Sequence, residues 1–207
     1  MTFICILLAN MIAAFIIYPK MPEMVPIHWN IQGEIDNYAS KTFGTFFLPI
    51  LNIAMYFLFL LLPKLDPKRA NYERFTKSYK LIRYTIHIYM SLMFVVTVYA
   101  GMGHSIDIGF WITIGISLLI IILGIVIGRV KHNYFVGFKL PWTLANEEVW
   151  DKTHRIGSKL MVVGGIIALA FAFLTENQTR FYSLMACIFI PLIITAVYSY
   201  MIYKKIV

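Results

Sequence analysis

The chain has 207 residues, of which 60% are hydrophobic and only 14% are charged. Soluble domains are typically about 45–50% apolar and about 25% charged, so a water-soluble fold could not bury this much apolar surface. The net charge of +8 is compatible with nucleic-acid binding by its size alone, and the positions of the basic residues decide that question. The composition excludes an ordinary soluble domain and favours a membrane protein.

Six runs of the chain are apolar enough to cross a membrane. A spanning helix needs about 20 apolar residues, because the hydrocarbon layer is about 30 Å thick and a helix rises about 1.5 Å per residue. The first run lacks a positively charged start and is followed by no polar mature domain, so we expect an uncleaved span rather than a signal peptide. The sequence therefore predicts an all-α integral membrane protein with six transmembrane helices, at approximately 2–18, 43–62, 81–101, 108–128, 160–174 and 181–203.

Fifteen of the eighteen basic residues fall on one side of this six-span arrangement. Residues 64–83 hold seven Lys or Arg, residues 129–159 hold six, and the tail adds Lys204 and Lys205. Cytoplasmic loops carry such an excess of positive charge. We therefore expect both termini and the second and fourth loops in the cytoplasm, and loops one, three and five outside. Membrane lipid is the expected partner of this charge pattern, and direct binding of nucleic acid is not expected.

Two long connections divide the chain into two halves of three spans each. The N-terminal half, 1–103, has an outward loop at 19–42, and the C-terminal half, 104–207, has an inward loop at 129–159. Polar residues within the spans are few and are expected to form hydrogen bonds between helices. The most prominent of these polar residues are Asn10, Asn52, His87 and Thr195.

The outward loop contains the segment IHWNIQGEIDNYASK, in which Gly33 is expected to form a turn. Trp29 and Tyr38 suit the headgroup region, since each ring has an apolar body and a polar group. The His and acidic residues match no metal-ligand spacing, so we expect neither a metal nor a cofactor. The loop is then either a folded lid or a contact surface for something outside the cell. The candidate contact residues are His28, Trp29, Asn30, Gly33 and Asp36.

The inward loop contains VGFKLPWTLANEEVWDKTHR, whose second half reads as a helix. Gly137 allows a turn, Pro141 disfavours helix before it, and Thr143 is the expected N-cap. Acidic residues precede basic ones along the helix, which suits its dipole. Two acid-first pairs at i,i+4 spacing should add a few tenths of a kcal/mol each. These pairs are Glu148–Lys152 and Asp151–Arg155.

The other face of this helix repeats at helical spacing through Asn146, Trp150, Thr153 and Gly157. Such a pattern is typical of an amphipathic helix lying in the membrane interface, here feeding the fifth span. Trp142 and Trp150 are expected to anchor it at headgroup level. Anchoring does not require so particular a sequence, which leaves contact with a partner as a second interpretation.

The inward pattern resembles the signature of the SdpI family of bacterial membrane proteins. The outward segment MVPIHWNIQGEIDNYASK similarly resembles an N-terminal domain of unknown function that is often fused to it. One departure is Lys139, where the family commonly has Arg, so a bidentate anion contact at this position is in doubt. The residues that carry the inward resemblance are Asn133, Gly137, Phe138, Pro141, Trp142, Thr143, Asn146, Trp150, His154 and Gly157.

This resemblance implies a six-span immunity protein of the bacterial cell membrane. Its expected partner is a secreted, membrane-active killing peptide of the SdpC type, against which it protects the producer. The resemblance also implies a signalling role, in which a cytoplasmic autorepressor of the SdpR type is held at the membrane when toxin is present. The inward signature residues are then candidates for partner docking. The basic second loop, KLDPKRANYERFTKSYK, is either a further docking site or a solvated loop.

Two other classes of function stay open at this point. A transporter or channel would need a polar path, for which Asn10, Asn52 and His87 are the candidates. The absence of acidic residues from the deep parts of the spans argues against a cation-coupled carrier. A membrane enzyme has no recognisable catalytic spacing, so no catalytic residue is assigned. Its scattered candidates are His132, His154, Glu147, Glu148 and Asp151 inside, and His28 with Asp36 outside.

Overall fold

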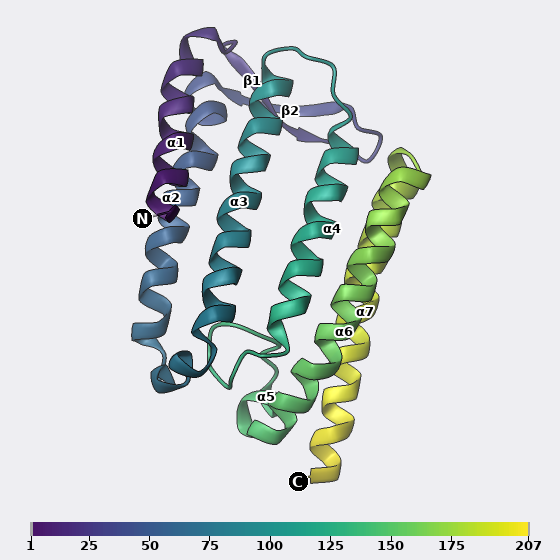
Figure 1. Cartoon of the computed structure of the whole chain (residues 1–207). Coiled ribbons are helices and arrows are strands. Elements are labelled where there is room, and N and C mark those ends of the chain that lie inside the picture. Colours follow the sequence, from purple (N-terminus) through teal and green to yellow (C-terminus); the bar gives the residue numbers. More distant parts are fainter. Residues whose placement is uncertain (1, 207) are drawn as a thin grey trace.

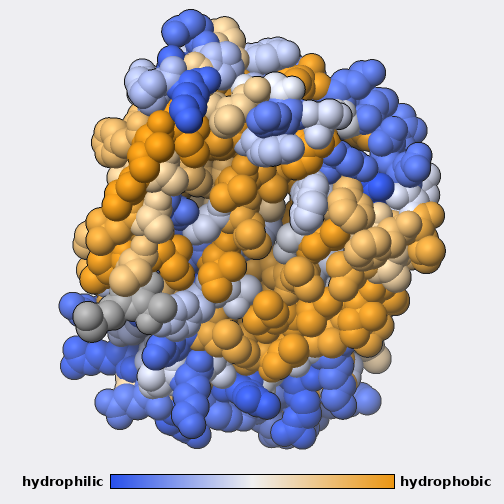
Figure 2. Space-filling view, turned by 45° about the horizontal axis from the view of Figure 1, so that its top comes forward, coloured by the Kyte–Doolittle hydropathy of each residue, from blue (hydrophilic) through white to orange (hydrophobic). Residues whose placement is uncertain are grey.

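Six long helices run roughly side by side in the computed structural model, which describes residues 2–206 (Figure 1). All six are long and apolar enough to span a membrane, which confirms the predicted number of spans. Apolar residues form a broad band between two hydrophilic ends (Figure 2). The chain is a predominantly α-helical, multi-pass membrane protein. The spanning helices are α1 (Thr2–Ile17), α2 (Lys41–Leu65), α3 (Thr76–Gly101), α4 (Ile108–Ile127), α6 (Glu147–Leu174) and α7 (Asn177–Ile206).

The connections gather at two opposite ends of the bundle. The end formed by residues 18–40, 102–107 and 175–176 is here named the hairpin end (Figure 1). The end formed by residues 66–75 and 128–146, where α7 also terminates, is named the loop end. The two long basic segments of the sequence both reach the loop end. The structure thus brings together the connections that the charge pattern predicts to share one side of the membrane.

A two-stranded antiparallel hairpin covers the hairpin end and was not predicted from the sequence. Strand β1 (Met24–Trp29) pairs with β2 (Ile35–Ser40), and Gly33 turns the chain with φ +82°, as expected. Val25 is fully buried against α2, because Gly44 leaves room for it: a Cβ on Gly44 would lie 2.5 Å from the Cβ of Val25. The hairpin is therefore seated on the bundle rather than free, and the expectation of an all-α chain is wrong in this segment.

Polar residues in the middle of the N-terminal half bond to one another across α1, α2 and α3. Asn10 Nδ2 donates to Ser91 Oγ at 2.6 Å, and Asn52 Oδ1 lies 2.5 Å from His87 Nδ1. The predicted interhelical hydrogen bonds are confirmed for these side chains. Thr195 differs, because its hydroxyl donates to the carbonyl of Pro191 in its own helix. Of the polar candidates for a transport path, Asn52 and His87 thus partner each other, and Asn10 partners Ser91.

Small residues let α6 pack closely against its neighbours in the C-terminal half. A Cβ on Gly164 would lie 2.5 Å from the carbonyl oxygen of Cys187 in α7. A Cβ on Gly165 would lie 2.6 Å from Ile121 in α4. Close backbone approach of this kind drives helix association in lipid, where hydrophobic burial gives little advantage. The three helices α4, α6 and α7 therefore form one tightly packed unit.

Candidate functional sites at the two ends of the bundle

Asn133 organises the connection that follows α4. Its side chain is fully buried, and its Oδ1 accepts hydrogen bonds from the backbone N–H groups of Phe135 (2.9 Å) and Val136 (2.7 Å). Its Nδ2 donates to the carbonyls of Lys131 (2.8 Å) and Val136 (2.9 Å). One amide side chain thus replaces the backbone partners that a helix or strand would supply in this irregular segment.

The second connection packs onto the fourth at the loop end through Asp66. This carboxylate is 1% exposed, and it accepts hydrogen bonds from the backbone N–H of Tyr134 (2.9 Å) and from the hydroxyl of Tyr72 (3.1 Å). Tyr72 and Phe75 are buried in the short helical segment η2 (Arg69–Phe75). The interpretation of the second loop as merely solvated is therefore wrong for these residues, because they join the two halves.

His154 fixes the backbone turn at Gly137 and Phe138 through hydrogen bonds made by its two ring nitrogens. Its Nδ1–H donates to the carbonyl of Trp150 (2.8 Å), which leaves Nε2 to accept from the backbone N–H of Phe138 (2.9 Å). Gly137 has φ +133°, and a Cβ there would lie 2.2 Å from His154 Nε2. The ring of Phe138 in turn covers Gly157, where a Cβ would meet it at 2.4 Å. Both ring nitrogens of the fully buried His154 are thus occupied, so it has no free nitrogen to act as a catalytic base.

Trp150 forms the centre of the loop end and has no exposed surface. Its Nε1–H donates to the carbonyl of Val130 (2.9 Å), and its ring stacks on His154 with the centroids 3.9 Å apart. The expectation that Trp150 anchors at headgroup level is therefore wrong. Trp142 is partly exposed, and its Nε1–H donates to Ser199 Oγ of α7 (2.6 Å).

The helix starts in this segment differ from the prediction. Pro141 begins a short helix, α5 (Pro141–Ala145), so Thr143 lies inside it and is not an N-cap. The Thr143 hydroxyl instead donates to the carbonyl of Phe138 (2.7 Å) and accepts from the N–H of Leu140 (2.9 Å). Asn146 caps α6, since its Oδ1 accepts hydrogen bonds from the backbone N–H groups of Glu148 and Val149.

The predicted interfacial helix is the first part of α6, which continues without a break from Glu147 to Leu174. Its inner face is covered by protein, because Trp150, Thr153 and His154 are all fully buried. On its outer face Glu148 pairs with Lys152 at 2.6 Å, which confirms that prediction. The other expected pair, of Asp151 with Arg155, does not form in the described chain, and Asp151 instead lies 3.6 Å from Lys131.

At the hairpin end of the bundle, the hairpin tip lies over the first turns of α4 and α7. A cavity of about 170 Å³ between them is lined by Trp29, Asn30 and Gly33 from the hairpin and by Asp107 and Arg180 from the helix ends. A neighbouring cavity of about 380 Å³ is bordered by the hairpin and α7, and its walls are His28, Trp29, Asn30, Ile31, Asp36 and Phe181. The predicted outward candidates are therefore brought together around one concave surface.

Individual outward candidates have local partners. His28 Nδ1 lies 2.5 Å from Asp36 Oδ1 across the two strands, and both side chains are exposed. Asn30 shapes the turn, since its Oδ1 accepts from the N–H groups of Gln32 and Glu34, both at 2.9 Å. Within residues 2–206 no group of three or more His, Cys, Asp or Glu is arranged to hold a metal.

An ion pair that was not predicted fastens α4 to α7 below the hairpin tip. The guanidinium of Arg180 is buried, and its Nη1 donates to Asp107 Oδ1 (3.0 Å) and Oδ2 (2.8 Å). Its Nε and Nη2 donate to the carbonyl of Thr175. Asp107 also caps α4 by accepting from the N–H of Phe110. A sequence signal existed, because Arg180 is one of only three basic residues outside residues 64–83, 129–159 and 204–205.

Comparison with known proteins finds two family models that match different parts of the chain. The model of the SdpI/YfhL protein family matches residues 129–199, which contain the whole signature network of the loop end. Over these residues the chain is similar to the SdpI/YfhL protein family. The model of a domain of unknown function (DUF1648) matches residues 5–53, which contain the hairpin. The resemblance stated from the sequence is confirmed.

One curated relative is similar to this chain along nearly its full length. The immunity protein SdpI of Bacillus subtilis (strain 168) is 26% identical over 202 residues, which is 98% of this chain and 94% of that protein. No solved structure matches the chain. The six candidate spanning helices, together with this similarity, are those of a multi-pass protein of the bacterial cell membrane.

A further polar cluster at the loop end joins Lys68, from the second connection, to His132 and Glu147. The Nζ of Lys68 lies 2.8 Å from His132 Nδ1 and 3.1 Å from Glu147 Oε1. This contact adds a second link between the two halves, beside that of Asp66. His132 and Glu147, which the sequence offered as possible catalytic residues, both contact the ammonium group of Lys68.

Asn133→Ala is expected to lower the free energy of unfolding by about 3 kcal/mol, because several buried backbone groups lose partners and each unsatisfied group costs about 1–3 kcal/mol. Thermal unfolding in detergent measures the effect. Asn71→Ala is the matched control, because Asn71 makes one hydrogen bond to the carbonyl of His132. An equal loss in both variants would contradict the organising role of Asn133.

Proposed function

We propose that this chain is an immunity protein that protects a bacterial cell from a secreted, membrane-active peptide by binding rather than by catalysis. The observation that carries the proposal is the match to an immunity protein along 98% of the chain. Because the match includes both the hairpin and the loop-end signature, it is not confined to one shared segment.

The proposal includes an orientation in the membrane. Fifteen of the eighteen basic residues lie in the loop end, in the parts of the helices that adjoin it or near the C-terminus. We therefore place the loop end in the cytoplasm, together with the N-terminus. The hairpin end then faces outside, where a secreted peptide arrives. The two halves, 1–103 and 104–207, are proposed as the structural units, and the second connection of the first half contacts the signature of the second.

We assign peptide contact to the hairpin end. His28, Trp29, Asn30, Gly33 and Asp36 border its concave surface, and the proposed toxin is a peptide of the SdpC type. Aromatic and polar groups that meet in a concave site are typical of binding sites. Asn30 and Gly33 shape the turn, so direct contact is assigned chiefly to Trp29 and to the exposed pair of His28 and Asp36.

A relay to a cytoplasmic repressor of the SdpR type is the second part of the proposal. The buried members of the signature, such as Asn133, Trp150 and His154, are inaccessible to a docking protein in this conformation. Docking is therefore assigned to exposed residues that the signature network positions. Glu148, Lys152 and Arg155 on the outer face of α6 are the candidates.

A challenge experiment tests both parts. The chain is expressed in a peptide-sensitive bacterium that also carries a fluorescently labelled SdpR-type repressor, and synthetic SdpC-type peptide is added. We expect survival at peptide concentrations that kill vector-only cells, together with movement of the label to the membrane. Equal killing of both strains would sink the immunity proposal, whereas survival without relocation would remove only the relay.

A further inference from the structure

Within residues 2–206, Arg83 is the only arginine that is partly buried and has no charged partner. Arg180 is buried in its pair with Asp107, and the other arginines are exposed. The Nε–H of Arg83 is buried and has no hydrogen-bond partner. A charged group inside a spanning helix is costly unless it is paired or hydrogen-bonded, so Arg83 calls for an acceptor from outside the chain. The exposed arginines are Arg69, Arg74, Arg129 and Arg155.

Aromatic rings from two other helices hold the guanidinium of Arg83 in place. Its central carbon, Cζ, lies 4.6 Å from the centre of the Phe3 ring in α1 and 5.6 Å from the centre of the Tyr56 ring in α2. Phe3 in turn stacks on Tyr84 of α3, with the ring centroids 3.9 Å apart. These rings attract the cation, but a ring face does not replace the oxygen acceptors that a guanidinium binds in pairs. The side chain is therefore positioned by the protein while its donors await an acceptor.

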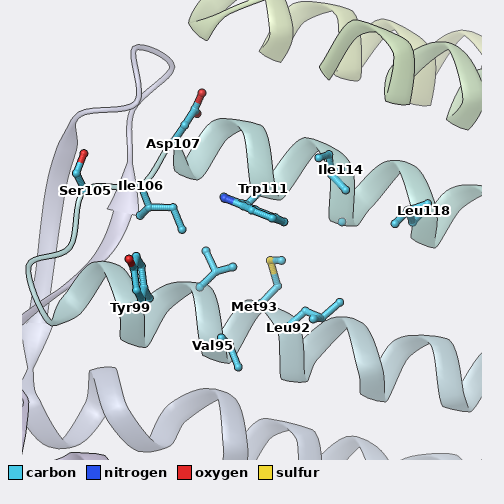
Figure 3. Close-up of a pocket in the computed structure, with 12 residues that line it drawn as sticks. Leu92, Met93, Val95, Tyr99, Ser105, Ile106, Asp107, Trp111, Ile114 and Leu118 are labelled. Carbon is cyan, nitrogen blue, oxygen red and sulfur yellow. The ribbon is translucent and has the colours of Figure 1, made fainter. Parts of the chain in front are cut away.

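The exposed surface of α3 changes from basic to apolar next to Arg83. Lys80 is exposed before it, whereas Leu81 starts an exposed apolar face that continues through Leu92 and Val95. The last two residues border an apolar groove of about 690 Å³ between α3 and α4 (Figure 3). Exposed apolar side chains on a spanning helix face hydrocarbon, and exposed lysines lie at headgroup level. Arg83 thus lies at the boundary between hydrocarbon and headgroups on the loop-end side of the membrane.

A lipid phosphate is the acceptor that this depth supplies. Side chains of a helix lean toward its N-terminus, and α3 begins at the loop end, so Arg83 is directed back toward the headgroups. A guanidinium binds phosphate oxygens through two N–H donors at once. An acidic segment of a water-soluble protein would have to enter the hydrocarbon boundary to make the same contact, which favours the lipid.

The neighbouring charge indicates a headgroup with a net negative charge. Lys80 precedes Arg83 by three residues, which places both side chains on neighbouring parts of one helix face. Its Nζ lies 5.8 Å from the centre of the Tyr84 ring, and within the part of the chain that the structure describes it has no acidic partner. Two unpaired cations attract an anionic headgroup, whereas they repel the ammonium group of a zwitterionic one.

We propose that Arg83, together with Lys80, binds the phosphate of an anionic phospholipid in the leaflet at the loop end. Phe3 and Tyr56 form the aromatic support of this site, so one lipid phosphate is held where α1, α2 and α3 meet. The site does not depend on the proposed immunity function, and it stands or falls separately from it.

Lipid retention by the intact chain tests the proposal. The detergent-solubilised protein is incubated with equal amounts of phosphatidylglycerol and phosphatidylcholine, and the retained lipid is identified by native mass spectrometry. We expect the wild-type chain to retain phosphatidylglycerol in preference to phosphatidylcholine. Arg83→Gln should lower the affinity for phosphatidylglycerol about tenfold, because the charge-assisted hydrogen bonds to the phosphate are lost. Equal retention of the two lipids by the wild-type chain would overturn the proposal, whether or not the variant folds.

Arg74→Gln is the matched control, because it removes the same charge from an exposed position in the connection before α3. We expect this variant to keep the wild-type preference for phosphatidylglycerol. Circular dichroism and gel filtration establish that both variants are folded. If the two variants lost the preference to the same extent, the attraction would be that of the whole basic surface, and the site at Arg83 would be wrong.

A soluble competitor separates a lipid from a free anion. Glycerol 3-phosphate carries a phosphate without acyl chains, and we expect a large excess of it to leave the retained phosphatidylglycerol in place. Displacement of the lipid by glycerol 3-phosphate would show that Arg83 binds phosphate from solution, and would overturn the assignment to a membrane lipid.

Discussion

Gly137→Ala is expected to lower the free energy of unfolding by about 3 kcal/mol, the sum of backbone strain and overpacking, each of about 1–3 kcal/mol. The strain arises because φ is +133°, where only glycine is at ease. The overpacking arises because the added Cβ would lie 2.2 Å from His154 Nε2 and 2.9 Å from the Trp150 ring. Thermal or denaturant unfolding of the detergent-solubilised protein measures the loss.

Gly103→Ala is the matched control for this prediction. Gly103 has φ +83°, and nothing lies within 4 Å of the Cβ that alanine would add. Its loss should therefore be limited to strain, about 1 kcal/mol. A Gly137 variant no less stable than the Gly103 variant would show that the packing of His154 and Trp150 against this glycine does not stabilise the loop end.

Trp150→Ala is expected to destabilise the chain by about 3–5 kcal/mol, the range found when a buried Trp or Phe is truncated to alanine. The variant loses the stacking on His154 and leaves the carbonyl of Val130 without its donor. Protection in the challenge assay should fall in parallel with the amount of folded protein in the membrane. Unfolding in detergent and membrane abundance in the challenged cells are measured together.

Trp142→Ala provides the contrast, because Trp142 is partly exposed and makes one hydrogen bond, to Ser199. Its loss of stability should be about 1 kcal/mol from that bond, with some lost packing in addition. If Trp150→Ala abolished protection with unchanged stability and abundance, Trp150 would be a contact residue and the structural interpretation of it would be wrong.

These two predictions bear on whether the family signature seats the loop end or faces a partner. Gly137, Trp150 and His154 are bonded or packed against one another rather than turned outward. This packing explains their identities, because Gly137 leaves room for the Trp150 ring, and the Trp150 ring stacks on His154. A partner at this end would contact exposed residues that the buried network positions, such as Glu148 and Lys152.

The sequence by itself determined the features that depend on composition and on local spacing. The six spans follow from the length of their apolar runs, and the basic connections that meet at the loop end follow from charge counting. The turn at Gly33 and the Glu148–Lys152 pair follow from spacings of a few residues, which local backbone geometry converts directly into contacts.

Only the tertiary structure decided which side chains are buried and which residues distant in the chain meet. Periodicity placed Trp150 on the apolar face of a helix, but lipid and protein interior are both apolar, so the pattern could not tell an anchor from a core residue. The pairs Asp107–Arg180 and Asp66–Tyr134 join residues 73 and 68 positions apart. The hairpin likewise depends on the cavity that Gly44 leaves for Val25, and such complementarity exists only once the helices have packed.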